Sequence, residues 1–179
     1  FADRWILSQS TTRSQPDPQD DVYYNCVAIS QTGDPTGAYY RYAFTTGNFF
    51  PDYPKYGIWK DSYVITTREF GPTVEYGIGV YAIDRNKMIN GAANPIIVSF
   101  FIDGNDPDLL PLVGDGLLPA DVDGKTKPKQ SAKIPLVGTQ DDDYFYGATS
   151  DALNIWELDV HWNANAVPNA TLDFAAQLP

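Results

Sequence analysis

The sequence has few of the residues from which reactive and metal-binding sites are usually built. Its 179 residues include one cysteine, Cys26, and one histidine, His161. A single cysteine excludes an internal disulfide and any zinc site that requires several thiolates. A nucleophilic cysteine needs a neighbouring base, and the only histidine is far away in the sequence. We therefore expect Cys26 to be a small apolar side chain on a strand, and His161 to be a packed histidine with Asp159 on the same strand face.

Basic residues are also scarce, with 12 Lys and Arg against 23 Asp and Glu, so the formal net charge is -11. An acidic chain of this kind repels phosphate backbones and anionic lipids, and we expect no nucleic-acid partner. No apolar run approaches the roughly 18 residues of a membrane span, which predicts no transmembrane segment. The first ten residues lack the basic and apolar regions of a signal peptide. Because Phe1 begins inside strand-like sequence, we expect the chain to belong to a longer precursor.

Aromatic residues, in contrast, are plentiful, with 12 Tyr and 9 Phe. Short apolar runs rich in Val, Ile, Tyr and Phe alternate with clusters of Gly, Pro, Asp and Asn, which predicts an all-β fold. Residues 84–91 are the one expected helical turn, with Asp84 as its cap and Gly91 at its end. The runs expected to be strands are RWILSQS (4–10), YYNCVAISQ (23–31), AYYRYAFTT (38–46), YGIWKD (56–61), SYVITTREF (62–70), GIGVYAID (77–84), PIIVSFFID (95–103), IPLVGTQ (134–140), LNIWELDVHW (153–162) and ATLDFAAQL (170–178).

These runs fall into three similar sets. WILSQ, YVITT and PLVGT begin the sets, CVAIS, GVYAID and IWELDV come second, and YYRYAF, IIVSFF and TLDFAA come third. Matching Ile6 with Val64, Ile29 with Ile83, and Tyr42 with Val98 gives a unit of roughly 55 residues, which is typical of a β-propeller blade. A β-sandwich is the alternative that the pattern leaves open.

The approximate blades are residues 1–50, 51–110 and 111–179 within a single β-propeller segment. Leading segments at 52–61 and 117–124 supply a fourth strand to the second and third units, whereas the first unit has none. About three blades do not close a propeller, and uncovered blade faces would meet water. We expect the remainder of a longer parent chain, or copies of the same chain, to cover them.

Several blocks carry a resemblance to a known family. The most specific are DPTGAYYRYAF (34–44), FPDYPKYGIWKDSYVITTREF (50–70) and LLPADVDG (117–124). The chain resembles a family of large secreted bacterial β-propeller proteins of mostly uncharacterised function. The resemblance implies export to the cell surface or the medium, and it brings no catalytic residues with it.

Acidic loops are the candidate metal sites. Asp103, Asn105, Asp106 and Asp108 lie together in DGNDPD, and such oxygen-rich loops can hold Ca²⁺. Turn chemistry, in which Asp and Asn accept hydrogen bonds from nearby backbone, explains the same residues and is the favoured interpretation. Further acidic loops contain Asp121, Asp123, Asp141, Asp142 and Asp143.

The block FPDYPKYGIW is the candidate ligand site. Tyr53, Tyr56 and Trp59 could stack on a sugar, with Asp52 and Lys55 as polar contacts. The competing interpretation, which we favour, is structural: the prolines stiffen a loop and the aromatics fill space between blades.

Taken together, these patterns favour a non-catalytic extracellular binding or structural module that binds a glycan, a protein or copies of itself. The alternative is a secreted carbohydrate-active hydrolase. Such an enzyme needs two carboxyl groups about 5–10 Å apart. Asp52, Asp61 and Asp123, near the expected strand starts, are the candidates.

Overall fold

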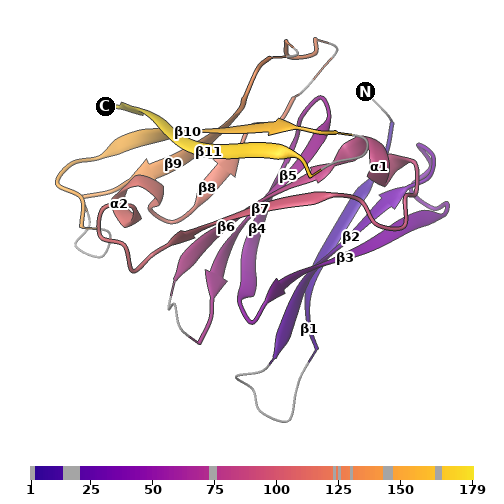
Figure 1. Ribbon diagram of the computed structural model, residues 1–179, viewed down its shortest axis with the longest axis horizontal. Helices are drawn as coiled ribbons and strands as arrows, with labels where there is room; N and C mark the ends of the chain where they lie inside the picture. The colour runs from indigo at the N-terminus through magenta and orange to yellow at the C-terminus, as the bar shows by residue number, and fades with distance from the viewer. Residues whose placement is uncertain are drawn as a thin grey trace.

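The computed structural model describes residues 3–13, 21–72, 76–122, 124, 126–129, 131–142, 147–163 and 167–179. These residues form three antiparallel sheets in which the strands follow one another in chain order (Figure 1). Two short helices, α1 (Arg85–Ile89) and α2 (Leu110–Val113), connect strands, and neither is long enough to cross a membrane. The all-β class expected from the sequence is confirmed.

The first sheet has three strands in the order β1-β2-β3, namely β1 (Ile6–Arg13), β2 (Val22–Ser30) and β3 (Tyr39–Gly47). Burial alternates along the second half of β2, because Asn25, Val27 and Ile29 point inward. Cys26 lies between them on β2 and is half-buried, on the opposite face of the sheet.

The second sheet has the order β4-β5-β6-β7, with β4 (Phe50–Ile58), β5 (Ser62–Phe70), β6 (Gly77–Asp84) and β7 (Ile97–Asp103). Every residue of β6 is buried, so both faces of this sheet are covered. Strand β4 lies at the sheet edge, which is where a strand tolerates the two prolines of its sequence.

The third sheet has the order β11-β10-β9-β8, with β8 (Leu117–Pro119), β9 (Ile134–Gln140), β10 (Ala152–His161) and β11 (Asn169–Leu178). The leading segments expected in the second and third units are therefore the edge strands β4 and β8. A short helix, α2, precedes β8, and no helix was expected from the sequence pattern there.

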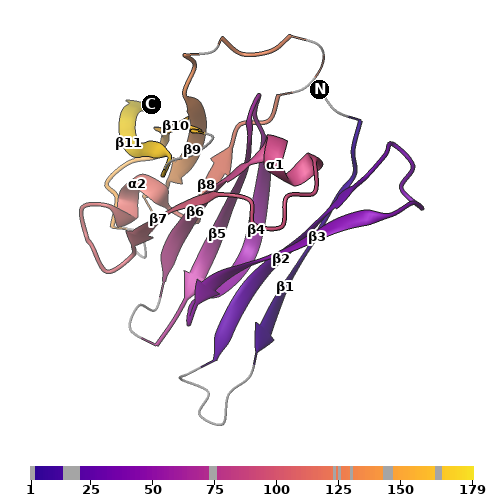
Figure 2. The same ribbon diagram turned by 45° about the vertical axis from the view of Figure 1, so that its right-hand side comes forward.

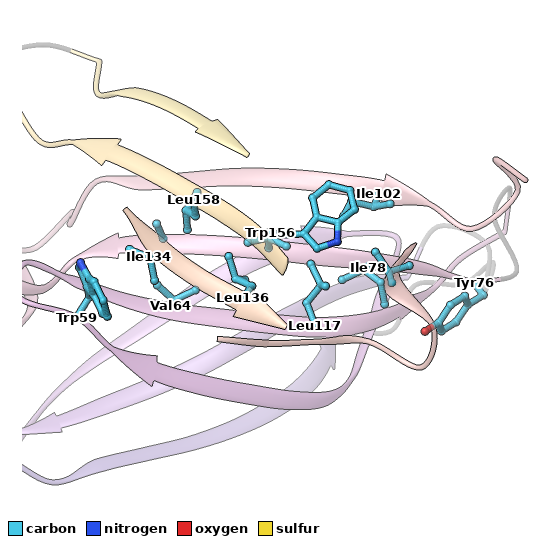
Figure 3. Packing of buried hydrophobic residues seen from close by; sticks show 13 residues of the cluster. Trp59, Val64, Tyr76, Ile78, Ile102, Leu117, Ile134, Leu136, Trp156 and Leu158 are labelled. Atoms are coloured by element: carbon cyan, nitrogen blue, oxygen red, sulfur yellow. The ribbon is translucent and has the colours of Figure 1, made fainter. Parts of the chain in front are cut away.

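The second sheet lies between the other two (Figure 2). Val27 and Ile29 of the first sheet pack against Tyr63, Ile65 and Ile83 of the second. The opposite face of the second sheet packs against the third sheet in a larger cluster, drawn in Figure 3, that includes Val64, Ile78, Leu136, Trp156 and Leu158. Each fully buried aliphatic side chain contributes roughly 2 kcal/mol of transfer free energy. The core is thus two apolar layers that sandwich one sheet.

The expected helical turn is confirmed as α1. The Asp84 side chain caps it by accepting a hydrogen bond from the Lys87 backbone N–H at 3.1 Å, and Gly91 follows with a positive φ of 73°. Arg85, buried in its first turn, donates to the Lys60 carbonyl at 3.3 Å and lies 5.7 Å from the Tyr63 ring centroid. These contacts fix α1 at the end of the second sheet where β4 turns into β5.

Candidate functional site

A polar cleft of about 870 Å³ opens at one end of the second and third sheets. Four segments form it: the turn between β4 and β5, helix α1 with its flanking residues, the segment that joins β8 to β9, and the end of β10. These segments meet because β5 and β9 begin, and β4, β6 and β10 end, at the same side of the stacked sheets (Figure 1). The cleft is therefore a product of the sheet stacking.

The β4–β5 turn supplies the floor. It is closed by the Trp59 backbone N–H, which donates to the Ser62 carbonyl at 2.9 Å. The Trp59 indole is largely buried but lines the cleft, and its N–H donates to the Ala132 carbonyl at 3.3 Å. Ser62 is fully buried, and its hydroxyl donates to Asp61 Oδ1 at 3.1 Å. The turn thus presents one indole and one carboxylate in fixed positions.

Helix α1 supplies a wall of polar side chains. Asn86, Lys87 and Asn90 line the cleft together with the capping residue Asp84. The Asn90 amide donates to the Asn86 carbonyl at 2.8 Å, which orients it along the helix. The side-chain amides of Asn86 and Asn90 and the ammonium group of Lys87 therefore line the cleft from the single short helix α1 and its C-cap.

The segment between β8 and β9 forms a second wall. It is attached to the second sheet where Asp121 Oδ1 accepts the Ile58 backbone N–H at 2.9 Å and the Val122 N–H donates to the Ile58 carbonyl at 2.9 Å. Farther along, Lys60 Nζ donates to the Lys129 carbonyl at 3.1 Å. Lys127 lies on the stretch between these attachments and lines the cleft. The carboxylate of Asp121 thus serves as a structural acceptor.

The end of β10 closes the cleft from the third sheet. His161 Nε2 lies 3.3 Å from Asp159 Oδ1, as expected for two residues on one strand face. Trp162 is half-buried, and its indole N–H donates to the Ser62 hydroxyl at 2.9 Å. This bond joins the third sheet to the second across the cleft.

The lining combines apolar rings with many donors and acceptors. It includes the carboxylates of Asp61, Asp84 and Asp159, the ammonium groups of Lys60, Lys87 and Lys127, and the amides of Asn86, Asn90 and Asn163. The imidazole of His161 and the indoles of Trp59 and Trp162 complete it. Formal charges in the lining are balanced, with three carboxylates and three ammonium groups. Such a surface suits a neutral, hydroxyl-rich ligand that offers an apolar face.

The ligand residues expected from FPDYPKYGIW do not form one surface. Tyr53 is 59% exposed, has a positive φ of 49°, and lies under the Lys55 ammonium, which is 3.0 Å from its ring centroid. Tyr56 instead packs between the first and second sheets, where burial raises the pKa of its phenol. Trp59 belongs to the opposite face of the sheet. Asp52 is exposed near the start of β4, so of these five residues only Trp59 lines the cleft.

The residues expected to bind metal in DGNDPD form turns. The Asn105 N–H donates to Asp103 Oδ1 at 2.8 Å, and the Asp108 N–H donates to Asp106 Oδ1 at 2.9 Å. This is the turn chemistry that the sequence analysis favoured. Calcium binding by these residues stays a prediction.

A different set of carboxylates comes together elsewhere. Asp141, Asp142 and Asp151 are exposed, each with an oxygen within 4.8 Å of the others, and the Asp142 backbone N–H donates to Asp151 Oδ1 at 3.1 Å. Asp123 and Asp143 lie outside the described residues. Asp52 lies near the start of β4 and Asp61 lies in the turn beyond its far end, so they do not form the carboxylate pair that a hydrolase requires.

Comparison with known proteins adds no relative: no family model matches the chain, and no match was found among curated proteins or solved structures.

Proposed function

We propose that this chain is a non-catalytic, extracellular binding module of β-propeller-like architecture, and that the cleft binds a saccharide. The observation that carries the proposal is the lining itself, in which the indoles of Trp59 and Trp162 stand among amides, carboxylates and ammonium groups. Secretion or a cell-surface location accompanies the proposal, in line with the family resemblance of the sequence.

A sugar matches both the aromatic rings and the hydrogen-bonding groups of the cleft. One face of a pyranose ring presents C–H groups that stack on an aromatic ring, while its hydroxyls act as both donors and acceptors. Asn86 and Asn90 offer both amide functions, and Asp159 and Asp61 offer acceptors. The 870 Å³ volume accommodates a short oligosaccharide, since ligand sites commonly measure 300–1,000 Å³.

The arrangement of the sheets supports the propeller part of the proposal. Three successive antiparallel meanders stack face to face, and the leading strands β4 and β8 contact one another. In a propeller, consecutive four-stranded blades stack in this way with their leading strands innermost. The first sheet would be a blade whose leading strand comes from elsewhere.

The test is binding of a panel of neutral and acidic oligosaccharides, followed by calorimetry on the best ligand. Trp162→Ala should lower affinity at least tenfold, because it removes a stacking face and the bond to Ser62. Asn86→Ala should lower it severalfold through a lost hydrogen bond. The matched control is Tyr53→Ala, an exposed aromatic residue outside the cleft, which should bind normally. Unchanged affinity in Trp162→Ala would refute the site.

Hydrolysis is the competing function, because Asp61, Asp84 and Asp159 all line the cleft. Asp84, however, is committed to capping α1, and Asp61 accepts a hydrogen bond from Ser62. We expect oligosaccharides incubated with the protein to be recovered intact by mass spectrometry. Cleavage products that disappear in Asp159→Asn or Asp61→Asn would establish the hydrolase instead.

A further inference from the structure

The two end sheets each leave one face uncovered by the described residues. Both faces of the second sheet are buried, whereas the first and third sheets each bury only the face that meets it. Figure 2 shows the first sheet at one end of the stack of three sheets and the third sheet at the other. The first outer face is the uncovered face of the first sheet, and the third outer face is the uncovered face of the third sheet.

The first outer face is apolar and hollowed. Leu7, Cys26, Ala28 and Ala43 point away from the core, and Leu7 is 55% exposed. Together with Arg41 they line a groove of about 480 Å³. Contiguous exposed apolar surface of this kind often marks a site at which another protein surface packs.

The third outer face is an apolar ridge. The strand registers place Leu118 beside Val137, Val137 beside Ile155, and Ile155 beside Ala176, in one row across all four strands. Leu153 and Leu178 pair in the neighbouring row, and both are about half exposed. The side chains that alternate with this row, including Leu136 and Trp156, face the second sheet.

The repeat makes these two faces complementary. The first outer face, which carries Leu7 on β1, is equivalent to the face of the second sheet that carries Ile65 on β5. In the second sheet this face is covered by the first sheet, and Ile65 is therefore only 1% exposed. The third outer face likewise corresponds to the face of the second sheet that carries Val64 and Val80, which the third sheet covers. A third outer face placed against a first outer face would therefore repeat the stacking that already occurs twice in this chain.

Charge favours the same pairing. Arg41 is exposed on the outward side of the first sheet, and among the described residues of β1, β2 and β3 no carboxylate lies on that side. The third outer face carries Glu157 and Asp173, with Lys133 paired to Glu157 at 3.0 Å. Two first outer faces would bring Arg41 side chains together, and two third outer faces would bring carboxylates together. Opposite charges meet only in the mixed arrangement.

We infer that the third outer face of one copy of this chain docks on the first outer face of a second copy. A pair related by a twofold axis makes this contact twice, because each copy contributes both faces, and two copies of three sheets then form a closed ring. Closure removes both exposed apolar faces from water, which is the driving force. This assembly is independent of whether the cleft binds a saccharide.

Analytical ultracentrifugation of the purified chain tests the inference. The wild-type chain, 19.8 kDa per copy, should sediment as a dimer. Leu7→Asp and Leu153→Asp should each shift it to the monomer, because each change spoils both contacts of the pair. Val167→Asp is the control, since Val167 is 90% exposed and lies outside both faces; it should remain dimeric. Circular dichroism melts within a few degrees of wild type establish that each variant is folded.

Mixing the two variants distinguishes the arrangement. An equimolar mixture of Leu7→Asp and Leu153→Asp should recover a dimer population, since the mixed pair contains one contact with both wild-type faces. A contact between two first outer faces would leave Leu153→Asp dimeric and would give no recovery on mixing, which overturns the inference. A monomeric wild-type chain would also overturn it, and would leave the two faces to further sheets of a longer polypeptide.

Discussion

The indole N–H of Trp162 donates a hydrogen bond of 2.9 Å to the hydroxyl of Ser62, a residue that precedes it by one hundred positions. The same Ser62 hydroxyl donates a hydrogen bond to Asp61 Oδ1 at 3.1 Å. One buried serine therefore orients both an indole and a carboxylate of the cleft, and it does so between two different sheets.

Replacing this serine should loosen the cleft without destroying the fold. Ser62→Ala leaves the Trp162 N–H without its acceptor and removes the donor to Asp61. We expect a loss of about 1–2 kcal/mol in the free energy of unfolding, and a several-fold loss of saccharide affinity. Chemical denaturation and calorimetry measure the two effects. As a control, Thr171→Ala removes an exposed hydroxyl outside the cleft that donates to Asp173, and it should change neither.

A buried carboxyl group should make stability fall as the pH rises. Glu69 is 1% exposed between the first and second sheets, where it accepts hydrogen bonds from the hydroxyls of Thr67 and Tyr81. Burial raises the pKa of Glu69 above its usual value, and these hydrogen bonds offset part of the rise. The folded state therefore binds the proton more tightly than the unfolded state. Stability should decline from the ordinary Glu pKa up to the folded pKa, and stay level above it.

Glu69→Gln tests this assignment, because its amide oxygen still accepts from Tyr81 and Thr67 while its charge is absent. At neutral pH we expect the variant to be more stable than wild type, because it avoids the cost of burying a charge. The difference should shrink as the pH is lowered toward the ordinary Glu pKa, because the wild-type carboxyl group is then protonated in the folded state. Denaturation curves between pH 4 and 8 measure it, and a difference that does not vary with pH would contradict the assignment.

Gly114 should be intolerant of any side chain. It ends α2 with φ 50° and ψ -126°, and a Cβ atom there would lie 2.0 Å from the Thr139 carbonyl oxygen. Gly114→Ala should cost about 3 kcal/mol or more through backbone strain and the clash. Gly147 also has a positive φ, 72°, but open space where a Cβ would point. Gly147→Ala should therefore cost only about 1 kcal/mol. Equal losses in thermal melts would refute the contact with β9.

Calcium binding by Asp103, Asn105, Asp106 and Asp108 can be tested by melting. Bound Ca²⁺ would raise the melting temperature, and a chelator would lower it, because a ligand of the folded state stabilises it by mass action. The observed turns satisfy two of these carboxylates without an ion. We expect the melting temperature to be the same in EDTA and in millimolar Ca²⁺, and a shift of several degrees would restore the calcium interpretation.

Most strands could be predicted from the sequence because apolar runs alternate with turn residues, and β5, β6 and β9 begin and end where expected. The matching of Ile29 with Ile83 was wrong by one residue. Ile6 pairs with Ile29, whereas Val64 pairs with Ala82, so Ile83 points to the opposite face. Strand β6 is buried on both faces, and its sequence therefore lacks the alternation that would reveal which residues share a side.

The cleft was harder to anticipate than the strands. Asp159 and His161 could be placed together from strand alternation, and the cap of α1 from its sequence pattern. The approach of Trp162 to Ser62 and of Lys60 to Lys129 depends on how separate sheets stack, which no local pattern encodes. Tyr56 and Trp59 were grouped as one stacking surface, but strand geometry directs them into different core layers.

The most direct test of the saccharide cleft uses the four tryptophans of the chain. Trp59 and Trp162 line the cleft, whereas Trp5 and Trp156 lie outside it. Indole N–H resonances of ¹⁵N-labelled protein should be followed during titration with the best oligosaccharide from the panel. If a saccharide binds in the cleft, the Trp59 and Trp162 signals should shift with ligand concentration, whereas those of Trp5 and Trp156 should not move. Shifts confined to Trp5 or Trp156, or no shift at a ligand concentration that saturates binding, would contradict it.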